Sequence, residues 1–325
     1  MSDIKTVYTR LGKISLRVSF LFAILFISFS CRDASQGKKN SFECPGLFPG
    51  VERPDSVARV FAPGLISTYN FEFSLIIHPC QKRIYYNIFE RANSRYSVFM
   101  VEEVNNVWNK PRKVFSDKYN NILCAVSSDG NTLYFYSDRP SRFGNGDLLA
   151  HSDIWVRQMG KGEPDTLQNI GTPINTRIRE LSLSVSHKNV IYYYSSDSNY
   201  KTSIYSSSFS GGIYTAPEIM GSEINDSEDA HNPCIAPDES YIIFTSYRTG
   251  GFGDADLYIS FHRSDGTWTQ AKNMGPEINS SSQDDFATLS PDGNYLFFST
   301  DRNSKGYCDI YWISTNIIEK LKPKD

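Results

Sequence analysis

Residues 289–314, LSPDGNYLFFSTDRNSKGYCDIYWIS, predict three short strands joined by two different connections. Pro291 to Asn294 forms a tight turn, because Pro presets φ at the second turn position and Gly and Asn tolerate positive φ. The runs Phe286 to Leu289 and Tyr295 to Ser299 then pair as a hairpin. A polar loop leads to a third run, Asp309 to Ile313. Its aromatic and β-branched residues favour a pleated sheet that is packed on both faces.

The same pattern occurs five times along the chain. Each copy has turn residues, an aromatic-rich run, a polar loop and a second run of the Asp-Ile-Tyr type. The residues that anchor the five turns lie 49, 58, 51 and 54 positions apart, and they are Cys80, Asp129, His187, Asp238 and Asp292. A period of about 50 residues indicates a propeller or a solenoid, because one unit with a few strands cannot bury its own faces.

The pattern S-P-D-G-x-x-L-x-F-x-S-x-R-x-G-x-x-D-I-Y resembles the TolB-type, WD-repeat-like β-propeller repeat family. The resemblance covers about Ser56 to Thr315; copies four and five match well, copy two fairly, and copies one and three loosely. It implies an all-β propeller with four-stranded antiparallel blades. Five anchors favour five blades, and a six-bladed ring would need a degenerate sixth unit. The resemblance implies little about function, since propellers include binding modules and enzymes.

Each repeat predicts strands A, B, C and D, which run outward from a central channel. The fifth repeat lacks a strand D, because the chain ends soon after Ser314. Residues 58–67, ARVFAPGLIS, resemble residues 271–280, AKNMGPEINS, which follow the strand C of repeat four. We therefore expect Val57 to Phe61 to pair with Asp309 to Ile313 as the outer strand of blade five. This closure would remove an exposed sheet edge.

The N-terminal 30 residues have the pattern of a targeting segment. Basic residues precede an apolar run from Val18 to Phe29, which is too short to span a bilayer comfortably. Ser28 to Cys31 is similar to a bacterial lipobox, which implies a diacylated Cys31 and a lipid anchor in the cell envelope, at the outer rather than the inner membrane. The alternative is a plain secretory signal. Residues 31–54 predict a flexible tether, 55–318 the propeller and 319–325 a polar tail.

Charge argues against a nucleic-acid partner. The whole chain has a net charge of −3, and residues 1–30 carry four basic residues against one acidic residue, so the remaining chain is more acidic still. It contains no basic stripe of the kind that binding to a phosphate backbone requires.

Five cysteines remain besides Cys31, and none has metal-ligand spacing. Cys124 and Cys234 fall in predicted inner strands, where a thiol packs as a small apolar group. Cys44 in the tether and Cys80 in the first A-to-B turn lie on the same predicted face of the ring. They form either a disulfide or two free thiols.

Several charged residues recur from repeat to repeat, which favours a structural role for them. They are the pairs Asp138-Arg139 and Asp301-Arg302, and the aspartates before strand C, Asp153, Asp256 and Asp309. A catalytic group is needed once, whereas a carboxylate that fixes a loop is needed in every blade.

A second set of acids falls at or near the start of strand A, and consists of Glu72, Glu180, Asp229 and Asp285. Inner strands begin beside the channel, so these carboxylates are expected to converge at its mouth. We expect no cofactor, although a carboxylate cluster of this kind would suit Ca²⁺. The alternative is that each acid caps its own D-to-A loop or faces solvent.

The B-to-C and D-to-A loops are the longer ones and lie on one face, so we expect recognition there. The candidate contacts on this loop face are Arg139, Arg142, Phe143, His151, His231, Arg248, Phe252, Arg302 and Tyr307. The alternative for the aromatic residues is that they pack back onto the blades.

Three functions remain open from the sequence. The first is a non-catalytic, envelope-anchored propeller that binds a protein or cell-wall partner through the loop face. The second is a carbohydrate-active hydrolase or lyase, which would need two suitably spaced carboxylates at the channel mouth. The third is a structural scaffold of an envelope complex. No Gly-x-Ser-x-Gly motif is present, which excludes a propeller-gated peptidase.

Overall fold

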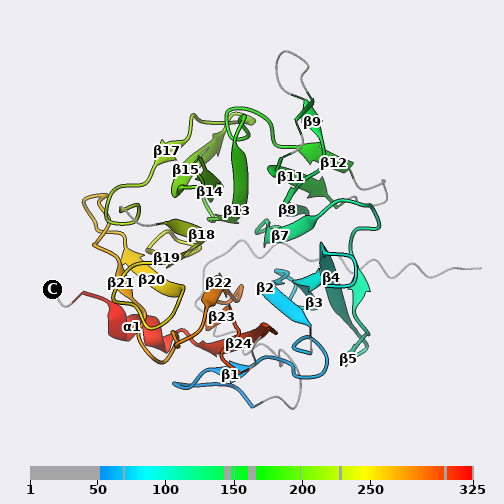
Figure 1. Cartoon of the computed structure of the whole chain (residues 1–325), viewed down its shortest axis with the longest axis vertical. Helices are drawn as coiled ribbons and strands as arrows, with labels where there is room; N and C mark the ends of the chain where they lie inside the picture. The colour runs from blue at the N-terminus through cyan, green and yellow to red at the C-terminus, as the bar shows by residue number, and fades with distance from the viewer. Residues whose placement is uncertain are drawn as a thin grey trace, which may run out of the picture. The chain divides into compact units, whose positions relative to one another are not determined.

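The computed structural model describes residues 52–68, 70–142, 148–149, 151–159, 166–197, 199–226, 229–303 and 306–323. Met1–Cys44 and Pro45–Asp325 are separate units, and the first lies wholly outside the described residues, as do Cys31 and the predicted targeting segment. The second unit is a five-bladed β-propeller (Figure 1). In the described part of the chain, no helix is long and apolar enough to cross a membrane.

The first three blades follow one another along the chain. Blade 1 contains β2 (Phe71–Ile77), β3 (Arg83–Glu90), β4 (Arg95–Val104), β5 (Val107–Trp108) and β6 (Arg112–Lys113). Blade 2 contains β7 (Asn121–Val126), β8 (Thr132–Ser137), β11 (Asp153–Gln158) and β12 (Thr166–Asn169), with the side hairpin β9 (Ser141–Arg142) and β10 (Leu148–Leu149). Blade 3 contains β13 (Arg179–Val185), β14 (Val190–Ser196), β15 (Thr202–Ser210), β16 (Ile213–Tyr214) and β17 (Glu218–Ile219).

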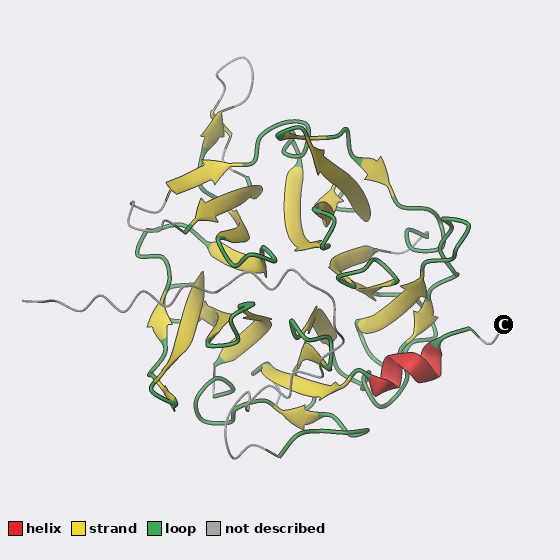
Figure 2. Ribbon diagram, turned by 180° about the vertical axis from the view of Figure 1, so that it is seen from behind, coloured by secondary structure: helices red, strands yellow, loops and turns green. Residues whose placement is uncertain are grey.

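The last two blades complete the ring. Blade 4 contains β18 (Ala230–Ile235), β19 (Tyr241–Ser246), β20 (Asp256–Phe261) and β21 (Lys272–Asn273). Blade 5 contains β22 (Asp284–Leu289), β23 (Tyr295–Thr300), β24 (Asp309–Ser314) and the N-terminal strand β1 (Arg59–Val60). Seen from the other side, the inner strands of all five blades surround one central axis (Figure 2).

The predicted closure by the N-terminal segment is confirmed. Arg59 pairs with Trp312 and Val60 with Tyr311, so β1 lies beside β24 although the two strands are far apart in sequence (Figure 1). The backbone N–H of Phe61 donates to the carbonyl of Ile310 at 2.8 Å, which extends the pairing. The outer edge of blade 5 is therefore covered, and no open β edge remains there to pair with another chain.

The tight turns between strands A and B also form as predicted. In blade 5 the N–H of Gly293 donates to the carbonyl of Ser290 at 2.9 Å, and Gly293 has a φ of 73°, which favours glycine. The outer strand is divided in two of the blades. In blade 1 the short strands β5 and β6 both pair with β4, and in blade 3 the short strands β16 and β17 both pair with β15.

The core consists of clusters between neighbouring blades. The cluster between blades 5 and 1, for example, packs the edge of Phe61 against Phe297 and Trp312, with ring centroids 5.0 and 5.3 Å apart. The chain then continues into α1 (Asn316–Leu321), which the sequence analysis does not predict. Ile317 and Ile318 of α1 are buried against the junction of blades 4 and 5.

Candidate functional site

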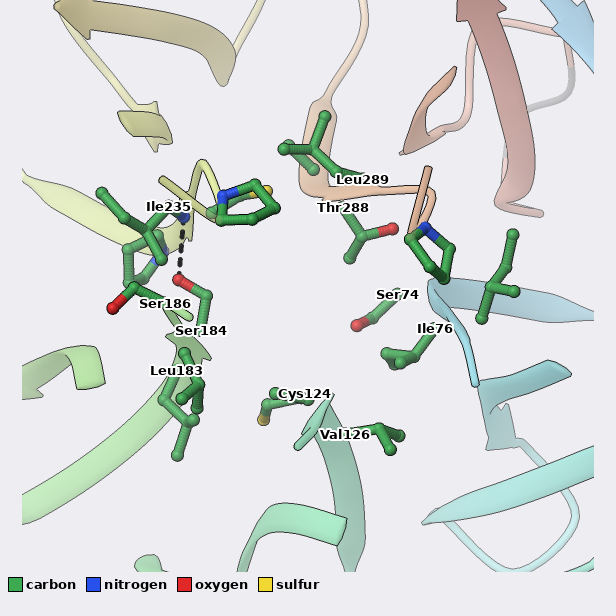
Figure 3. A pocket seen from close by; sticks show the side chains of 18 of the residues that line it. Ser74, Ile76, Cys124, Val126, Leu183, Ser184, Ser186, Ile235, Thr288 and Leu289 are labelled. Atoms are coloured by element: carbon green, nitrogen blue, oxygen red, sulfur yellow. Dashed lines mark hydrogen bonds between the residues drawn. The ribbon is translucent and has the colours of Figure 1, made fainter. Parts of the chain in front are cut away.

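A central cavity of about 340 Å³ lies among the inner strands of all five blades (Figure 3). Its wall is formed mainly by strands β2, β7, β13, β18 and β22, because the inner strand of each blade borders the propeller axis. The cavity extends to the turns between strands A and B, where Pro79, Ser128, His187, Pro237 and Pro291 surround its opening. It therefore opens on the face of the A-to-B turns, which we call the turn face.

The lining is apolar with scattered hydroxyl groups. Ile76, Val126, Leu183 and Ile235 are among the apolar residues, and Ser74, Ser182, Ser184, Ser186 and Thr288 are among the hydroxyl residues. Among the described residues that line the cavity there is no Asp, Glu, Lys or Arg. Such a wall suits an uncharged ligand, because a buried charge without a partner carries a large desolvation cost.

Two lining cysteines are kept protonated. Burial raises the pKa of the Cys124 thiol to about 11 and that of the Cys234 thiol to about 12. A thiol with such a pKa is a poor nucleophile near neutral pH, since the thiolate is the reactive form. Both residues lie in inner strands, as predicted, and act as small apolar groups.

A polar cluster lies between the cavity and the loop face. The side-chain amide of Asn232 donates to Oδ1 of Asp285 at 2.7 Å, and the hydroxyl of Thr245 donates to the same oxygen at 2.5 Å. His231 Nε2 lies 3.9 Å from Oδ2 of Asp285, and its ring stacks on Tyr247. Burial lowers the pKa of His231, while the charges of Asp285 and Asp229 oppose this shift. The cluster links blade 4 to blade 5.

Asn232 connects this cluster to the cavity. It lines the cavity, is 4% exposed and has a φ of 47°. Its side-chain carbonyl oxygen has no hydrogen-bond partner among the described residues. A ligand that carries one hydrogen-bond donor would satisfy this oxygen, which is otherwise an unfavourable buried group.

The four acids predicted at the channel mouth do not form one group. Glu72 and Glu180 occupy equivalent positions in blades 1 and 3, where each accepts a hydrogen bond from a threonine of its own D-to-A loop, Thr68 and Thr176. These two acids therefore cap their own loops, which is the alternative that the sequence analysis left open. Burial raises the pKa of both acids, that of Glu180 to about 7.

Asp229 and Asp285 do not occupy the position of Glu72 in their own blades. Asp229 lies one residue before that position in blade 4, and Asp285 lies one residue after it in blade 5. Asp229 precedes β18 and accepts the N–H of Thr202 at 3.1 Å, whereas Asp285 belongs to the polar cluster above. The equivalent acid of blade 5 is Asp284, which the sequence analysis missed. Within the described ranges, no three His, Cys, Asp or Glu side chains group closely enough to hold a metal ion. The possible Ca²⁺ remains a prediction.

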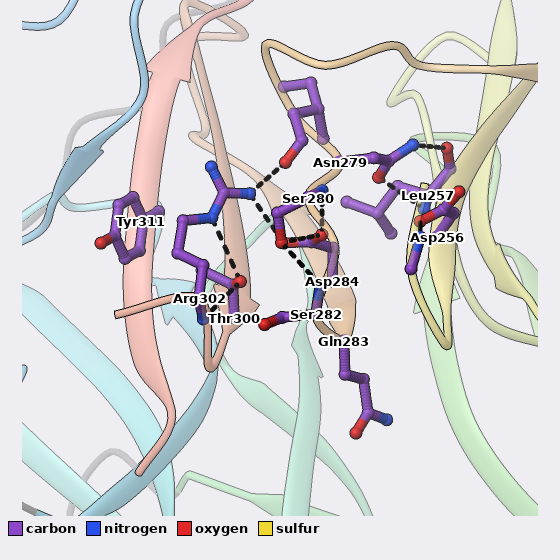
Figure 4. A network of polar contacts seen from close by, with 12 residues as sticks. Asp256, Leu257, Asn279, Ser280, Ser282, Gln283, Asp284, Thr300, Arg302 and Tyr311 are labelled. Atoms are coloured by element: carbon purple, nitrogen blue, oxygen red, sulfur yellow. Dashed lines mark hydrogen bonds and ion pairs between the residues drawn. The ribbon is translucent and has the colours of Figure 1, made fainter. Parts of the chain in front are cut away.

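Three of the arginines predicted for the loop face, Arg139, Arg248 and Arg302, point into the blades instead. Arg302 donates to Asp284 at 2.7 Å, to the carbonyl of Ile278 and to the hydroxyl of Thr300 (Figure 4). Arg139 pairs with Asp117 at 2.9 Å, and Arg248 pairs with Asp226 at 2.6 Å. Each side chain fixes the loop that precedes its blade, so its guanidinium group is engaged within the fold.

The remaining loop-face candidates are scattered. His151 lies 3.0 Å from the carboxylate of Asp153, and His231 is buried in the polar cluster. Phe252 and Tyr307 are exposed, and the ring of Tyr307 stacks with the guanidinium of Arg91 at 5.1 Å. Phe143 and the side chain of Arg142 lie outside the described residues.

Three of the recurring aspartates, Asp138, Asp256 and Asp301, fix loops, as expected from their repetition. Asp256 accepts the N–H groups of Phe252 and Gly253 at 2.6 and 3.1 Å, and Asp138 accepts the N–H of Asn120 at 2.9 Å. Asp301 accepts the N–H of Gln283 at 3.1 Å. These carboxylates satisfy loop N–H groups that would otherwise lack partners.

Cys80 lies in the first A-to-B turn, as predicted, and its thiol is free. The ring of His78 contacts its sulfur at 2.9 Å and the carbonyl of Gly130 in blade 2 at 2.9 Å, so His78 joins two turns. Burial would raise the pKa of Cys80, but the hydrogen bond with His78 and further contacts give a net lowering. Cys44, its proposed partner, lies outside the described residues.

The neutral cavity is not predicted by the sequence. One signal for it is present in blade 3, where residues 182–186 read SLSVS and alternate small hydroxyl and apolar side chains along an inner strand. Such alternation resembles that of any half-buried strand, so it does not identify a cavity until the five inner strands are brought together.

No family model matches the chain, and no curated protein matches it either. Solved structures similar to it include a protein described as TolB of Agrobacterium tumefaciens, at 18% identity over 72% of this chain and 71% of that one, with a TM-score of 0.47. An α-L-arabinofuranosidase of Lactobacillus brevis is 14% identical over 76% of this chain and 91% of that one, with a TM-score of 0.50. A thermostable family-43 glycoside hydrolase is 13% identical over 77% and 91%, with a TM-score of 0.47.

The arabinofuranosidase therefore shares the β-propeller fold with this chain, and at this identity the likeness shows the fold alone. The two likenesses with a TM-score below 0.5 support no inference about chemistry. Function has to be inferred from the site itself.

Proposed function

We propose that the propeller is a non-catalytic binding module that receives an uncharged ligand, or an uncharged segment of a protein or cell-wall partner, in its central cavity. One observation carries this proposal: the cavity of about 340 Å³ has no Asp, Glu, Lys or Arg among its described lining residues. Its size is within the range of small-molecule sites, and its lining is apolar with a few polar groups.

The same lining argues against catalysis inside the cavity. General acid–base or covalent chemistry requires a titratable or nucleophilic group. Among the described lining residues the thiols have raised pKa values, and His187 lies at the opening without an acidic residue beside it in the lining. The hydrolase alternative would require two facing carboxylates. Asp285 is linked to the cavity through Asn232, while Glu72 and Glu180 are bound to threonines of their own loops.

The location of the protein is part of the proposal. The lipobox-like segment favours an envelope lipoprotein whose propeller is tethered to the membrane through Cys31 and residues 31–54. A partner in the envelope would then reach the cavity through the turn face. Recognition by the loop face, which the sequence favours, stays a prediction for Phe252 and Tyr307.

Binding of uncharged dyes tests the cavity directly. We expect the neutral, environment-sensitive dye prodan to bind the protein, and the anionic dye 1-anilinonaphthalene-8-sulfonate to bind much less, since its sulfonate would lack a partner. Val126 lies in the cavity wall near the turn face, so Val126→Phe should weaken prodan binding about tenfold by filling the entrance. Val104→Phe is the matched control, because Val104 is 47% exposed on blade 1 outside the cavity lining.

The partner is tested with the same pair of variants. Tagged protein would be used to recover binding partners from envelope extract, and a partner of the cavity should be retained by Val104→Phe and lost from Val126→Phe. Equal dye binding by the two variants would overturn the cavity as the site. Steady hydrolysis of a panel of chromogenic glycosides above the rate in buffer would overturn the non-catalytic assignment.

A further inference from the structure

Each blade carries an aromatic pair at the same place in its sheet. One ring comes from strand B and the other from the residue opposite it in strand C. In blade order the pairs are Tyr86 and Phe99, Phe135 and Trp155, Tyr193 and Tyr205, Phe244 and Tyr258, and Phe298 and Tyr311. Their equivalence follows from the register of the strands and does not depend on a sequence alignment.

In blades 2, 4 and 5 an arginine covers this pair. The arginine stands four residues after the strand B ring in each case, at Arg139, Arg248 and Arg302. Its guanidinium carbon lies 5.1 to 5.3 Å from the centroids of both rings. Each arginine also pairs with a carboxylate: Asp117 and Asp226 come from the loops before blades 2 and 4, and Asp284 is the first residue of β22 in blade 5. Figure 4 shows the arrangement around Arg302, with Asp284 on one side and Tyr311 on the other. Charge and ring stacking both favour a guanidinium there.

Blade 1 keeps the rings and the acid but lacks the arginine. Its residue four positions after Tyr86 is Glu90. Glu72 occupies the position of Asp284, is fully buried, and its Oε2 atom has no hydrogen-bond partner among the described residues. Its other carboxylate oxygen accepts the hydroxyl of Thr68. An acid built into the same place as Asp284 therefore has no cation beside it in the described structure.

A pocket occupies the place of the missing side chain. Its volume is about 440 Å³, and Glu72, Tyr86 and Phe99 all line it, together with Leu65 and Glu90. We propose that this pocket binds the guanidinium group of an arginine side chain from outside the chain, with the group stacked on Tyr86 and Phe99 and paired with Glu72. The three arginines of the other blades show how such a group fits. The proposal does not depend on the central cavity.

The charges around the pocket are compatible with this ligand. Lys113 pairs with Glu90 at 2.8 Å, and its ammonium nitrogen lies over the ring of Phe99, 5.7 Å from the centroid. Arg91, which also lines the pocket, stacks on Tyr307 instead. Burial, and to a smaller degree the charge of Asp309, raises the pKa of Glu72. A bound guanidinium would stabilise the ionised carboxylate, so binding should strengthen as pH rises through the pKa of Glu72.

Methylguanidine is the simplest probe, and methylurea is its uncharged counterpart. Isothermal titration of the mature protein should detect methylguanidinium binding and no comparable binding of methylurea. Glu72→Gln should weaken methylguanidinium binding about tenfold or more, because it removes a charge-assisted hydrogen bond. Glu103→Gln, on the same blade but outside the pocket lining, should leave the affinity unchanged.

Two further sets of ligands show whether the bound guanidinium group comes from a polypeptide or from a free amino acid. Acetyl-arginine amide and the peptide Gly-Gly-Arg-Gly-Gly represent an arginine within a polypeptide, and free arginine represents an amino-acid ligand. Acetylated peptides with lysine or citrulline in place of arginine should bind more weakly, since neither has the planar charged fork.

A second variant keeps the test decisive if Glu72→Gln does not fold. Glu90→Arg combined with Lys113→Gln would place an arginine at the position used by the other blades, and it should abolish methylguanidinium binding while the protein still melts cooperatively. Equal binding of methylguanidine and methylurea, or unchanged methylguanidinium affinity in both the Glu72 and the Glu90 variants, would overturn the proposal.

Discussion

Blades 1 and 5 are built on the same plan, but only blade 5 satisfies its buried acid from within. Asp284 receives the guanidinium of Arg302 at 2.7 Å, together with the N–H and hydroxyl of Ser280. Glu72, at the same position in blade 1, has a threonine partner and one unpartnered oxygen beside a pocket. The comparison shows that the motif arginine belongs to the internal structure of a blade, and that its absence leaves a site open to an external cation.

The largest difference between the two blades is expected when the internal arginine is removed. Arg302→Met should lower the free energy of unfolding by about 3 to 5 kcal/mol, because it leaves the fully buried Asp284 without its cation. Glu72→Gln in blade 1 should change it little, since the raised pKa of Glu72 favours the neutral acid. Urea unfolding of both variants, followed by tryptophan fluorescence, measures the contrast.

A double variant checks the cause of that loss. Asp284→Asn added to Arg302→Met should recover more than half of the lost stability, because no buried charge then remains. If the double variant is as unstable as Arg302→Met, the arginine stabilises blade 5 through packing on Phe298 and Tyr311, and not through Asp284.

Blade 3 extends the comparison, since it also has an acid at this position and no arginine. Burial raises the pKa of Glu180 from its ordinary value of 4.5 to about 7. The folded state therefore binds this proton more tightly than the unfolded state does. The protonated Glu180 therefore contributes to the free energy of unfolding, and this contribution is fully present below pH 4.5. It is lost as the pH rises to about 7, and the loss is at most about 3 kcal/mol.

The variant Glu180→Gln isolates this effect. Subtracting its stability profile from that of the wild type, measured by urea unfolding between pH 4 and 8, should leave a decline between about pH 4.5 and 7 and a flat region above it. A difference profile that rises with pH over this interval would mean that Glu180 has a cationic partner in solution, as Asp284 does.

The smallest effect is expected in the exposed part of the blade 4 loop. Phe252 is 48% exposed, whereas Arg248, a few residues earlier, is paired with Asp226 inside the fold. Phe252→Ala should change the free energy of unfolding by less than about 0.5 kcal/mol and leave prodan binding intact. A loss of partner recovery in this variant, with dye binding retained, would move recognition from the turn face to the loop face.

The sequence was sufficient for the architecture because the repeats are local and regular. The closure by Arg59 and Val60 could be predicted from two observations, namely the missing outer strand of the fifth repeat and the similarity of residues 58–67 to residues 271–280. The structural role of the repeated aspartates could be predicted in the same way. Helix α1 could not, because the six-residue segment is short and its anchoring contacts with blades 4 and 5 are not local.

The candidate sites could be predicted only in part. Asp284 and Asp285 are adjacent in sequence, and only the strand register shows that Asp284, opposite Thr300, is the equivalent of Glu72, opposite Ile88. The inward direction of the arginines depends on a ring pair contributed by two strands, which no single stretch reveals. Blade 1 has Glu90 at the position where blades 2, 4 and 5 have an arginine, and it keeps the acid Glu72. A comparison of the repeats could have found this difference, which marks the pocket of blade 1.

The pKa of Glu72 tests the central comparison most directly. It can be measured by carbon-13 NMR of the side-chain carboxyl group, assigned with the Glu72→Gln variant, in the wild type and in Glu90→Arg combined with Lys113→Gln. We expect a pKa of Glu72 above the ordinary value of 4.5 in the wild type, and a fall below that value once an arginine lies beside the acid. An ordinary pKa in the wild type that does not change in the double variant would contradict this expectation.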